Sequence, residues 1–190
     1  MKILVEGNTD KKFVIDYLSH IGLRLKSDDL IVIQGYSSLP KFKNEIQREH
    51  DLGGNTVVVL DADDNPGEKR EMVAQVEGEL SVPVPAFLFP NDRDGGTLED
   101  LLSSVVNPAH CVVLKCFDGY QDCLCADDNY SYTLPGKKAK IYAYCEAVLP
   151  ANEKEKFKEE KRDYLNKELW DLESHHLKSF REFLLKHVAF

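Results

Sequence analysis

Short apolar runs alternate with longer helical patterns through the first half of the chain, and this alternation constrains the fold more than any other feature. The runs lie at residues 2–5, 30–33, 56–60 and 86–89. Between them, apolar residues recur at the three- and four-residue spacing of a helix, as in residues 13–21. Strands that alternate with helices build βαβ units, so we expect an α/β fold with a mostly parallel, Rossmann-like sheet flanked by helices.

Local signals place the expected helices of this half. Asn8 or Thr9 is a plausible cap for the first helix, and Gly22 is placed to end it. The second helix is expected from residue 37 to about residue 50. The third follows the break at Pro66 and Gly67 and continues to about residue 80.

Beyond residue 105 the pattern predicts helices only. We expect helices from about residue 108 to 124 and from 137 to 149, separated by a polar loop at 127–136, and a final helix at 177–188. Residues 151–173 mix charges of both signs, above a helical apolar stripe formed by Phe157, Tyr164, Leu165, Leu169 and Leu172. We therefore divide the chain into an α/β core at 1–105 and a helical extension at 106–190, packed together as one structural unit.

Composition excludes several classes of protein. The 190 residues are 43% hydrophobic, enough for a substantial core. The sequence has neither a signal-peptide pattern nor a segment long and apolar enough to cross a bilayer, so we expect a cytoplasmic protein without a membrane partner. The net charge of −9 argues against broad, nonspecific adhesion to nucleic acid, although a local basic strip could still contact phosphates.

The cysteine pattern indicates neither a disulfide framework nor a structural zinc site. The five cysteines are an odd number and lack the paired Cys-x-x-Cys spacing of zinc ligands. We expect reduced and mostly buried thiols. We also expect His175 and His176 to be surface residues, and Trp170 and Tyr164 to belong to the core.

Acidic residues stand where the first and third strands should end. Glu6 follows the first strand, and Asp61 and Asp63 follow the third. If these strands are neighbours, Glu6 should meet Asp61 at the edge of the sheet where ligands of α/β proteins bind. Clustered carboxylates repel one another unless a cation lies between them, and oxygen ligands suit Mg²⁺ or Mn²⁺.

These residues resemble the signature of the TOPRIM domain, which type IA topoisomerases, primases, some ribonucleases and the OLD-family nucleases share. The resemblance lies in the Glu6, Gly7 and Asp10 motif after the first strand, followed about 55 residues later by the Asp61 and Asp63 pair. The segment 96–102 and the helical tail look closest to small stand-alone TOPRIM proteins related to the OLD nucleases. This resemblance implies hydrolysis of phosphodiester bonds in DNA or RNA with Mg²⁺ or Mn²⁺.

The resemblance also implies roles for individual residues. Glu6 matches the glutamate thought to act as general acid or base, or as a metal ligand, and the Asp61 and Asp63 pair matches the metal ligands. Glu99 matches an additional acid that some OLD-type members use. OLD nucleases usually carry an ATPase domain, and this sequence has no phosphate-binding Gly-x-x-x-x-Gly-Lys-Ser/Thr loop, so any ATPase would be a separate partner chain.

A basic group after the polar loop is the candidate phosphate-binding element. Lys137, Lys138 and Lys140 open the helix at 137–149, and OLD-type sites use a lysine near the metals. The alternative is that these lysines, like Lys11 and Lys12, are only solvated surface residues.

Other interpretations of the acids remain open at this point. The chain could be a non-catalytic or regulatory module that binds metal, nucleic acid or a partner protein. The acids could also be helix caps in a plain α/β domain, since Asp is common in turns. A phosphorylated receiver domain fits poorly, because Lys115 falls within an expected helix.

Overall fold

The computed structural model describes residues 1–188, apart from the side chains at 154, 157 and 160. Its sheet contains four parallel strands in the order β2-β1-β3-β4. They are β1 Lys2–Val5, β2 Leu30–Val32, β3 Thr56–Asp61 and β4 Ala86–Phe89. The predicted α/β class with a parallel sheet is confirmed.

Helices account for most of the remaining regular structure. The α-helices are α1 Asn8–His20, α2 Lys43–Asp51, α3 Pro66–Leu80, α4 Leu98–Ser104, α5 Cys111–Cys125, α6 Lys137–Val148 and α7 Lys178–His187. Short 3-10 helices are η1 Ser27–Asp29, η2 Tyr36–Phe42, η3 Pro108–His110, η4 Ala151–Phe157, η5 Glu159–Lys161 and η6 His175–Leu177. Within residues 1–188, no helix has the length and apolar character that crossing a membrane requires.

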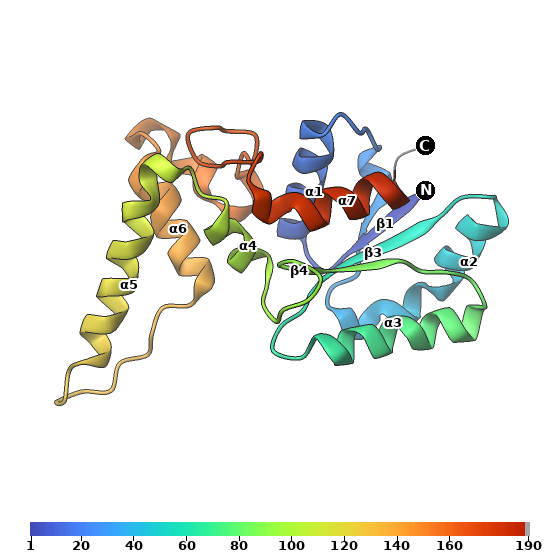
Figure 1. Ribbon diagram of the computed structural model, residues 1–190, viewed down its shortest axis with the longest axis horizontal. Coiled ribbons are helices and arrows are strands. Elements are labelled where there is room, and N and C mark those ends of the chain that lie inside the picture. The colour runs from blue at the N-terminus through green and yellow to red at the C-terminus, as the bar shows by residue number, and fades with distance from the viewer. Residues whose placement is uncertain (189–190) are drawn as a thin grey trace.

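The sheet is covered on both faces, which explains why the inner positions of its strands are apolar on both sides. Successive side chains of a strand point to opposite faces. Ile3 and Val57 lie in one buried cluster with residues of α1 and α7, whereas Leu4 and Val58 lie in a second cluster with residues of α2 and α3. Figure 1 shows α1 and α7 on one side of the sheet and α2 and α3 on the other.

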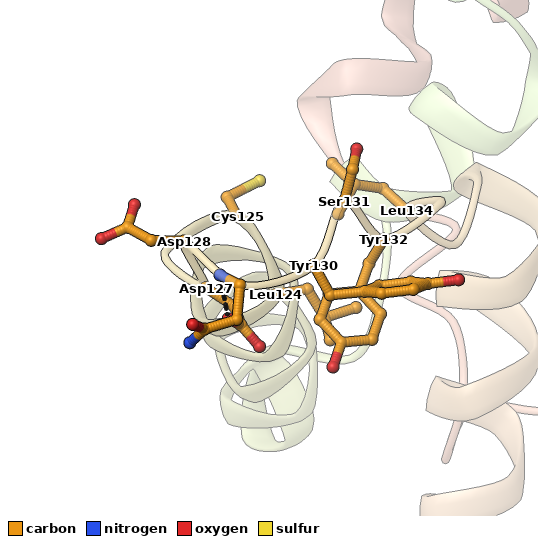
Figure 2. A pocket seen from close by; sticks show the side chains of 9 residues that line it. Leu124, Cys125, Asp127, Asp128, Tyr130, Ser131, Tyr132 and Leu134 are labelled. Atoms are coloured by element: carbon orange, nitrogen blue, oxygen red, sulfur yellow. Dashed lines mark hydrogen bonds between the residues drawn. The ribbon is translucent and has the colours of Figure 1, made fainter.

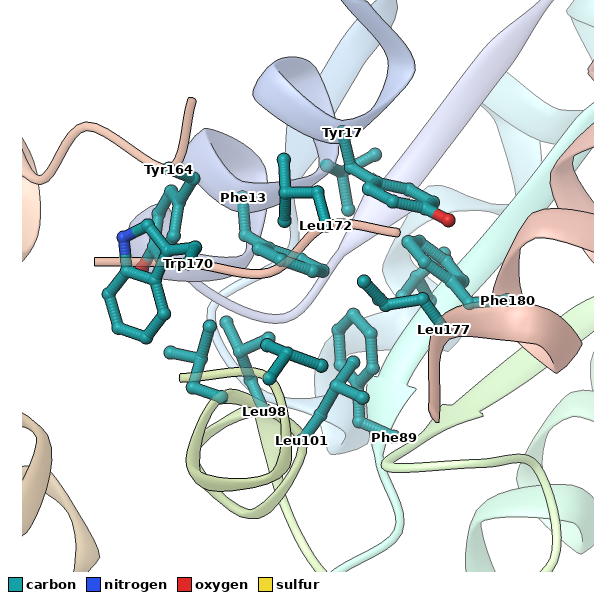
Figure 3. Close-up of a cluster of buried hydrophobic side chains, with 14 of the residues drawn as sticks. Phe13, Tyr17, Phe89, Leu98, Leu101, Tyr164, Trp170, Leu172, Leu177 and Phe180 are labelled. Atoms are coloured by element: carbon teal, nitrogen blue, oxygen red, sulfur yellow. The ribbon is translucent and has the colours of Figure 1, made fainter. Parts of the chain in front are cut away.

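The C-terminal part of the chain completes the larger of these two clusters. Phe180 of α7 packs between rings from α1 and from the sheet, with ring centroids 6.1 Å from Phe13, 4.9 Å from Phe87 and 5.2 Å from Phe89. Trp170 also belongs to the cluster (Figure 3). The core therefore runs without interruption from the first 105 residues into the C-terminal segment.

Helices α5 and α6 form a hairpin that projects from the rest of the molecule (Figure 1). The polar loop predicted at 127–136 joins them. At its tip the rings of Tyr130 and Tyr132 lie 4.8 Å apart, close to Leu124 at the end of α5 (Figure 2). We call residues 111–148 the hairpin arm.

The prediction of a helical apolar stripe across residues 151–173 is wrong. The structure has only the short turns η4 and η5 there, followed by irregular chain from residue 162 to 174. Trp170 and Tyr164 are buried as predicted, but Leu165 is 44% exposed and the side chain of Phe157 lies outside the described residues. The apolar residues of this segment fill the core from an irregular backbone, which the helical spacing could not reveal.

Three smaller predictions also need correction. The segment expected as one helix at 37–50 is the 3-10 helix η2 followed by α2. The cap of α1 is Gly7 and not Asn8 or Thr9. Cysteines were expected to be mostly buried, but Cys145 is buried and the other four are exposed, because α5, which carries those four, stands out in the hairpin arm.

Replacing Phe180 by alanine should destabilise the fold strongly. The change leaves a cavity between α7 and the sheet, so we expect a loss of about 3–5 kcal/mol of unfolding free energy. Chemical denaturation followed by circular dichroism measures this loss. Leu185→Ala, at a 44% exposed position of the same helix, serves as the control and should change stability by less than about 0.5 kcal/mol.

Candidate active site

Glu6 lies immediately after β1, where the neighbouring strand β3 brings Asp61 beside it. Glu6 Oε2 accepts a hydrogen bond from the backbone N–H of Asp61 at 3.3 Å. Glu6 Oε1 accepts another from the backbone N–H of Tyr36 at 3.4 Å. The expected meeting of Glu6 and Asp61 at adjacent strand ends is confirmed, and these bonds fix the Glu6 carboxylate between β3 and the chain that follows β2.

Gly7 and Asp10 form the turn between β1 and α1. The Asp10 carboxylate accepts a hydrogen bond from the Gly7 N–H at 2.7 Å, as a capping residue of the first helical turn does. A Cβ at Gly7 would lie 3.2 Å from Asp10 Oδ2, which is tighter than an ordinary contact. A glycine at this position therefore lets the buried Asp10 carboxylate approach the end of the strand.

Asp61 closes β3 and turns its carboxylate toward the start of α4. Its Oδ1 accepts a hydrogen bond from the Leu98 N–H at 2.8 Å. The next residue, Glu99, is only 6% exposed. A cavity of about 470 Å³ is lined by Glu6, Asp10, Asp61 and Glu99, so four carboxylates from four different elements face one space.

Burial and mutual repulsion raise the pKa of two of these acids. Burial, followed by the charge of Asp10, raises the pKa of Asp61 to about 8, with smaller contributions from Glu99 and Glu6 and an opposing effect of the Leu98 N–H. Burial, with Glu6 and Glu99, raises the pKa of Asp10 to about 6. The cavity thus concentrates negative charge that the neighbouring backbone N–H groups compensate only in part.

The lining of the cavity also contains a cation and a hydroxyl, both bound to one glutamate. Thr9 Oγ1 donates a hydrogen bond to Glu159 Oε2 at 3.1 Å, and Lys138 Nζ lies 3.6 Å from the same oxygen. All three residues line the cavity. The Glu159 carboxylate therefore occupies a position where an anion contacts both the Lys138 ammonium group and the Thr9 hydroxyl.

Asp63 does not share the cavity with Asp61. Its backbone has a φ of 50°, so the chain is no longer extended and the two carboxylates diverge. Asp63 Oδ2 pairs with Lys69 Nζ at 2.7 Å, and that buried ammonium group lies 3.2 Å above the ring of Tyr36. The Asp63 side chain is 51% exposed.

Two glycines hold Asp63 in this conformation. Asp63 and Gly96 exchange backbone hydrogen bonds of 2.8 and 2.7 Å, which form an isolated antiparallel bridge. A Cβ at Gly95 would lie 2.7 Å from the Asp63 carbonyl oxygen, and Gly96 has a φ of +141°. This bridge also fixes the start of α4, and with it the Leu98 N–H and Glu99, beside the end of β3.

The three lysines in the first turn of α6 pair with different acids. Only Lys138 lines the cavity. Lys137 Nζ pairs with Asp100 at 2.7 Å, and this hydrogen bond is the main cause of the raised pKa of Lys137, to which the charge of Glu99 adds a smaller contribution. Lys140 pairs with Asp118 of α5, away from the cavity. His175 and His176 are exposed, as predicted.

The carboxylate oxygens of the cavity suit a hard divalent cation, although the described side chains do not converge on a single metal position. Among the described residues, no three His, Cys, Asp or Glu side chains are grouped closely enough to hold a metal ion. The backbone N–H bonds to Asp61 and Asp10 each use one oxygen of the two. The remaining oxygens, with those of Glu6 and Glu99, are the carboxylate donors that Mg²⁺ and Mn²⁺ prefer.

Sequence patterns missed several residues of this region, namely Thr9, Lys69 and Glu159. Lys69 lies on a helix and Glu159 in a charge-rich segment, where charged residues are usually solvated, so nothing local distinguished them. For Thr9, its position close to the Glu6 and Gly7 motif was the one signal in the sequence that could have placed it in the site.

The chain matches, over residues 1–188, the model of a family described as a protein of unknown function, DUF3226. It therefore belongs to that family. Comparison with curated proteins found no match, and neither did comparison with solved structures.

Asp61→Asn should stabilise the protein in the absence of metal. The folded pKa of about 8 exceeds the ordinary value of 3.8, so the contribution of Asp61 favours the fold fully below pH 3.8 and is lost as the pH rises toward 8. Asparagine keeps the oxygen that accepts from Leu98 but carries no charge. We expect a gain on the order of 2 kcal/mol at pH 8 that disappears near pH 4.

Thermal denaturation in a chelating buffer across this pH range measures the effect. Glu146→Gln, at an exposed position of α6, removes the same charge outside the cavity and should leave the pH profile unchanged. An Asp61→Asn protein that is less stable than the wild type at pH 8 would contradict the prediction.

Proposed function

We propose that this protein is a divalent-metal-dependent phosphodiesterase that acts on DNA or RNA, with a TOPRIM-like core related to the OLD nucleases. The observation that carries the proposal is the cavity where Glu6, Asp10, Asp61 and Glu99 meet at the carboxyl ends of β1 and β3. Carboxylates buried together in this way need a cation for compensation, and a metal bound by carboxylates is the usual site for binding a phosphate.

Two further observations support the proposal. The adjacency of β1 and β3 places Glu6 against Asp61, which is the meeting that the resemblance requires. Glu99, the additional acid implied by OLD-type relatives, lines the same cavity. The position of Asp63, which pairs with Lys69, departs from the implied Asp-x-Asp ligand pair.

The residues of the cavity divide into metal ligands, a proton-transfer group and phosphate-binding groups. Asp61, Asp10 and Glu99 would hold Mg²⁺ or Mn²⁺, which when bound supplies positive charge for a phosphate oxygen and lowers the pKa of a water. Glu6, fixed by two backbone N–H groups, is placed to accept or give a proton. Lys138 and Thr9, which also line the cavity, are placed to bind a phosphate of the substrate.

Calorimetric titration of Mn²⁺ into the metal-free protein tests the site before any substrate is known. We expect binding by the wild type, weakened at least about 10-fold by Asp61→Asn, because a buried carboxylate ligand is lost. Glu6→Gln tests whether Glu6 is itself a ligand. Asp128→Asn at the tip of the hairpin arm removes an exposed acid outside the cavity and should bind like the wild type.

Cleavage assays then separate the enzyme from a binding module. Single- and double-stranded DNA and RNA are incubated with Mn²⁺, and Asp61→Asn should abolish any cleavage. Cleavage that survives this change would overturn the assigned mechanism. Metal binding without cleavage of any of these substrates would favour a regulatory module, an interpretation that the diversion of Asp63 to Lys69 also favours.

Glu159→Gln should increase the affinity for a phosphate-bearing ligand. The substitution removes the negative charge that competes for Lys138 and Thr9, and we expect about 2- to 5-fold tighter binding of a short oligonucleotide in Ca²⁺ buffer. Fluorescence anisotropy measures the affinity. Glu155→Gln, in the same segment but paired with Lys158 and Lys161, is the control and should show wild-type binding.

A further inference from the structure

Helix α5 presents an uncharged face that nothing in the described part of the chain covers. Val112, Cys116, Gly119 and Cys123 recur at spacings of four, three and four residues, so they form one stripe along the helix. Val112 is 58% exposed, and both cysteines are exposed. The half-buried residues of α5, such as Phe117 and Gln121, lie on the other side, where Gln121 donates to the Pro135 carbonyl at 2.7 Å.

Gly119 lies at the middle of this stripe, and no contact in the described part of the chain requires a glycine there. Glycine weakens the interior of a helix, and it is retained where another backbone comes close or a special conformation is needed. Gly119 has ordinary helical surroundings, and a Cβ there would meet nothing within 4 Å. Its lack of a side chain therefore lets a second helix approach closely from outside.

Charged residues on one edge of the stripe are complementary under two-fold symmetry. Lys115 lies four residues before Gly119, and Asp122 lies three residues after it. Both side chains are exposed, and neither forms an ion pair with any residue the structure describes. If two copies of α5 cross antiparallel at Gly119, Lys115 of each copy lies beside Asp122 of the other, because both residues are on the same edge of the helix.

We propose that the protein forms an antiparallel dimer through the stripe of α5, with the two Gly119 residues at the two-fold axis. The two α5 helices then pack against each other with each α6 on the outer side, and the two ion pairs set the register. Cys116 of one copy lies opposite Cys123 of the other, since these residues stand three and four positions on either side of Gly119. The proposal is independent of the phosphodiesterase assignment, because no residue of the α5 stripe lines the acidic cavity.

The size of the interface indicates an association that depends on concentration. The 15 residues of α5 span about 22 Å, so one helix pair buries less surface than most obligate dimers do. We therefore expect monomers at low concentration and dimers at high concentration, with dissociation in the micromolar range.

Sedimentation velocity over a concentration series tests the dimer with charge-swapped variants of the full chain. Lys115→Glu should weaken association at least about 5-fold, and the double variant Lys115→Glu with Asp122→Lys should restore it, because the pair is only reversed. Lys186→Glu makes the same charge change on α7 and should associate like the wild type. Wild-type protein that remains monomeric throughout, or a double variant that stays as weak as Lys115→Glu, would overturn the proposal.

Gly119→Glu separates the dimer from the fold of the monomer. Two carboxylates would meet at the two-fold axis, so dimers should be lost, whereas helix propensity improves and the melting temperature of the monomer should not fall. Dimers that persist in this variant would place the interface elsewhere.

Cysteine pairing tests the orientation of the helices. Two variants keep, among the four exposed cysteines, only Cys116 or only Cys123. Under mild oxidation their mixture should give a covalent dimer, and each variant alone should give little, because only Cys116 and Cys123 face each other. Efficient pairing within the Cys116 variant alone would indicate parallel helices and contradict the antiparallel arrangement.

Discussion

The parallel pairing of β1 with β3 is the interaction on which the candidate site depends. Its register sets Val5 beside Val59, so the residues just past both strands emerge at one edge of the sheet. Glu6 then accepts a hydrogen bond from the backbone of Asp61, and α1 begins at the same point with Asp10. One strand pairing thus assembles acids that are about 55 residues apart in sequence.

A second constraint, the bridge between Asp63 and Gly96, completes the arrangement from the other side. It returns the chain after β4 to the end of β3 and places the Leu98 N–H on the Asp61 carboxylate. The bridge has two opposite effects on the acids, because it brings Glu99 into the cavity while it turns Asp63 out toward Lys69. Electrostatic repulsion in the cavity is lower than it would be if Asp63 joined the acids that already line it.

Local sequence predicted the sheet because each strand is buried on both faces and so reads as a continuous apolar run. The positions of Glu6 and Asp61 followed from the general rule that functional residues gather at the carboxyl ends of parallel strands. By contrast, Asp63 was misplaced because its conformation depends on Gly95 and Gly96, which lie more than thirty residues away. The partners of Thr9 and Lys138 were equally hidden, since Glu159 reaches them from the short 3-10 helix η5 in the charge-rich segment.

The covering of the sheet by α7 has a consequence for how the protein is made. Phe13, Phe87 and Phe89 can meet Phe180 only after residue 180 has left the ribosome. Until then the part of the sheet face that α7 covers leaves aromatic surface exposed beside α1, which is the kind of intermediate that aggregates or recruits chaperones. Synthesis therefore includes a vulnerable interval before α7 is available, and a nascent chain stalled before residue 178 should be a target for quality control.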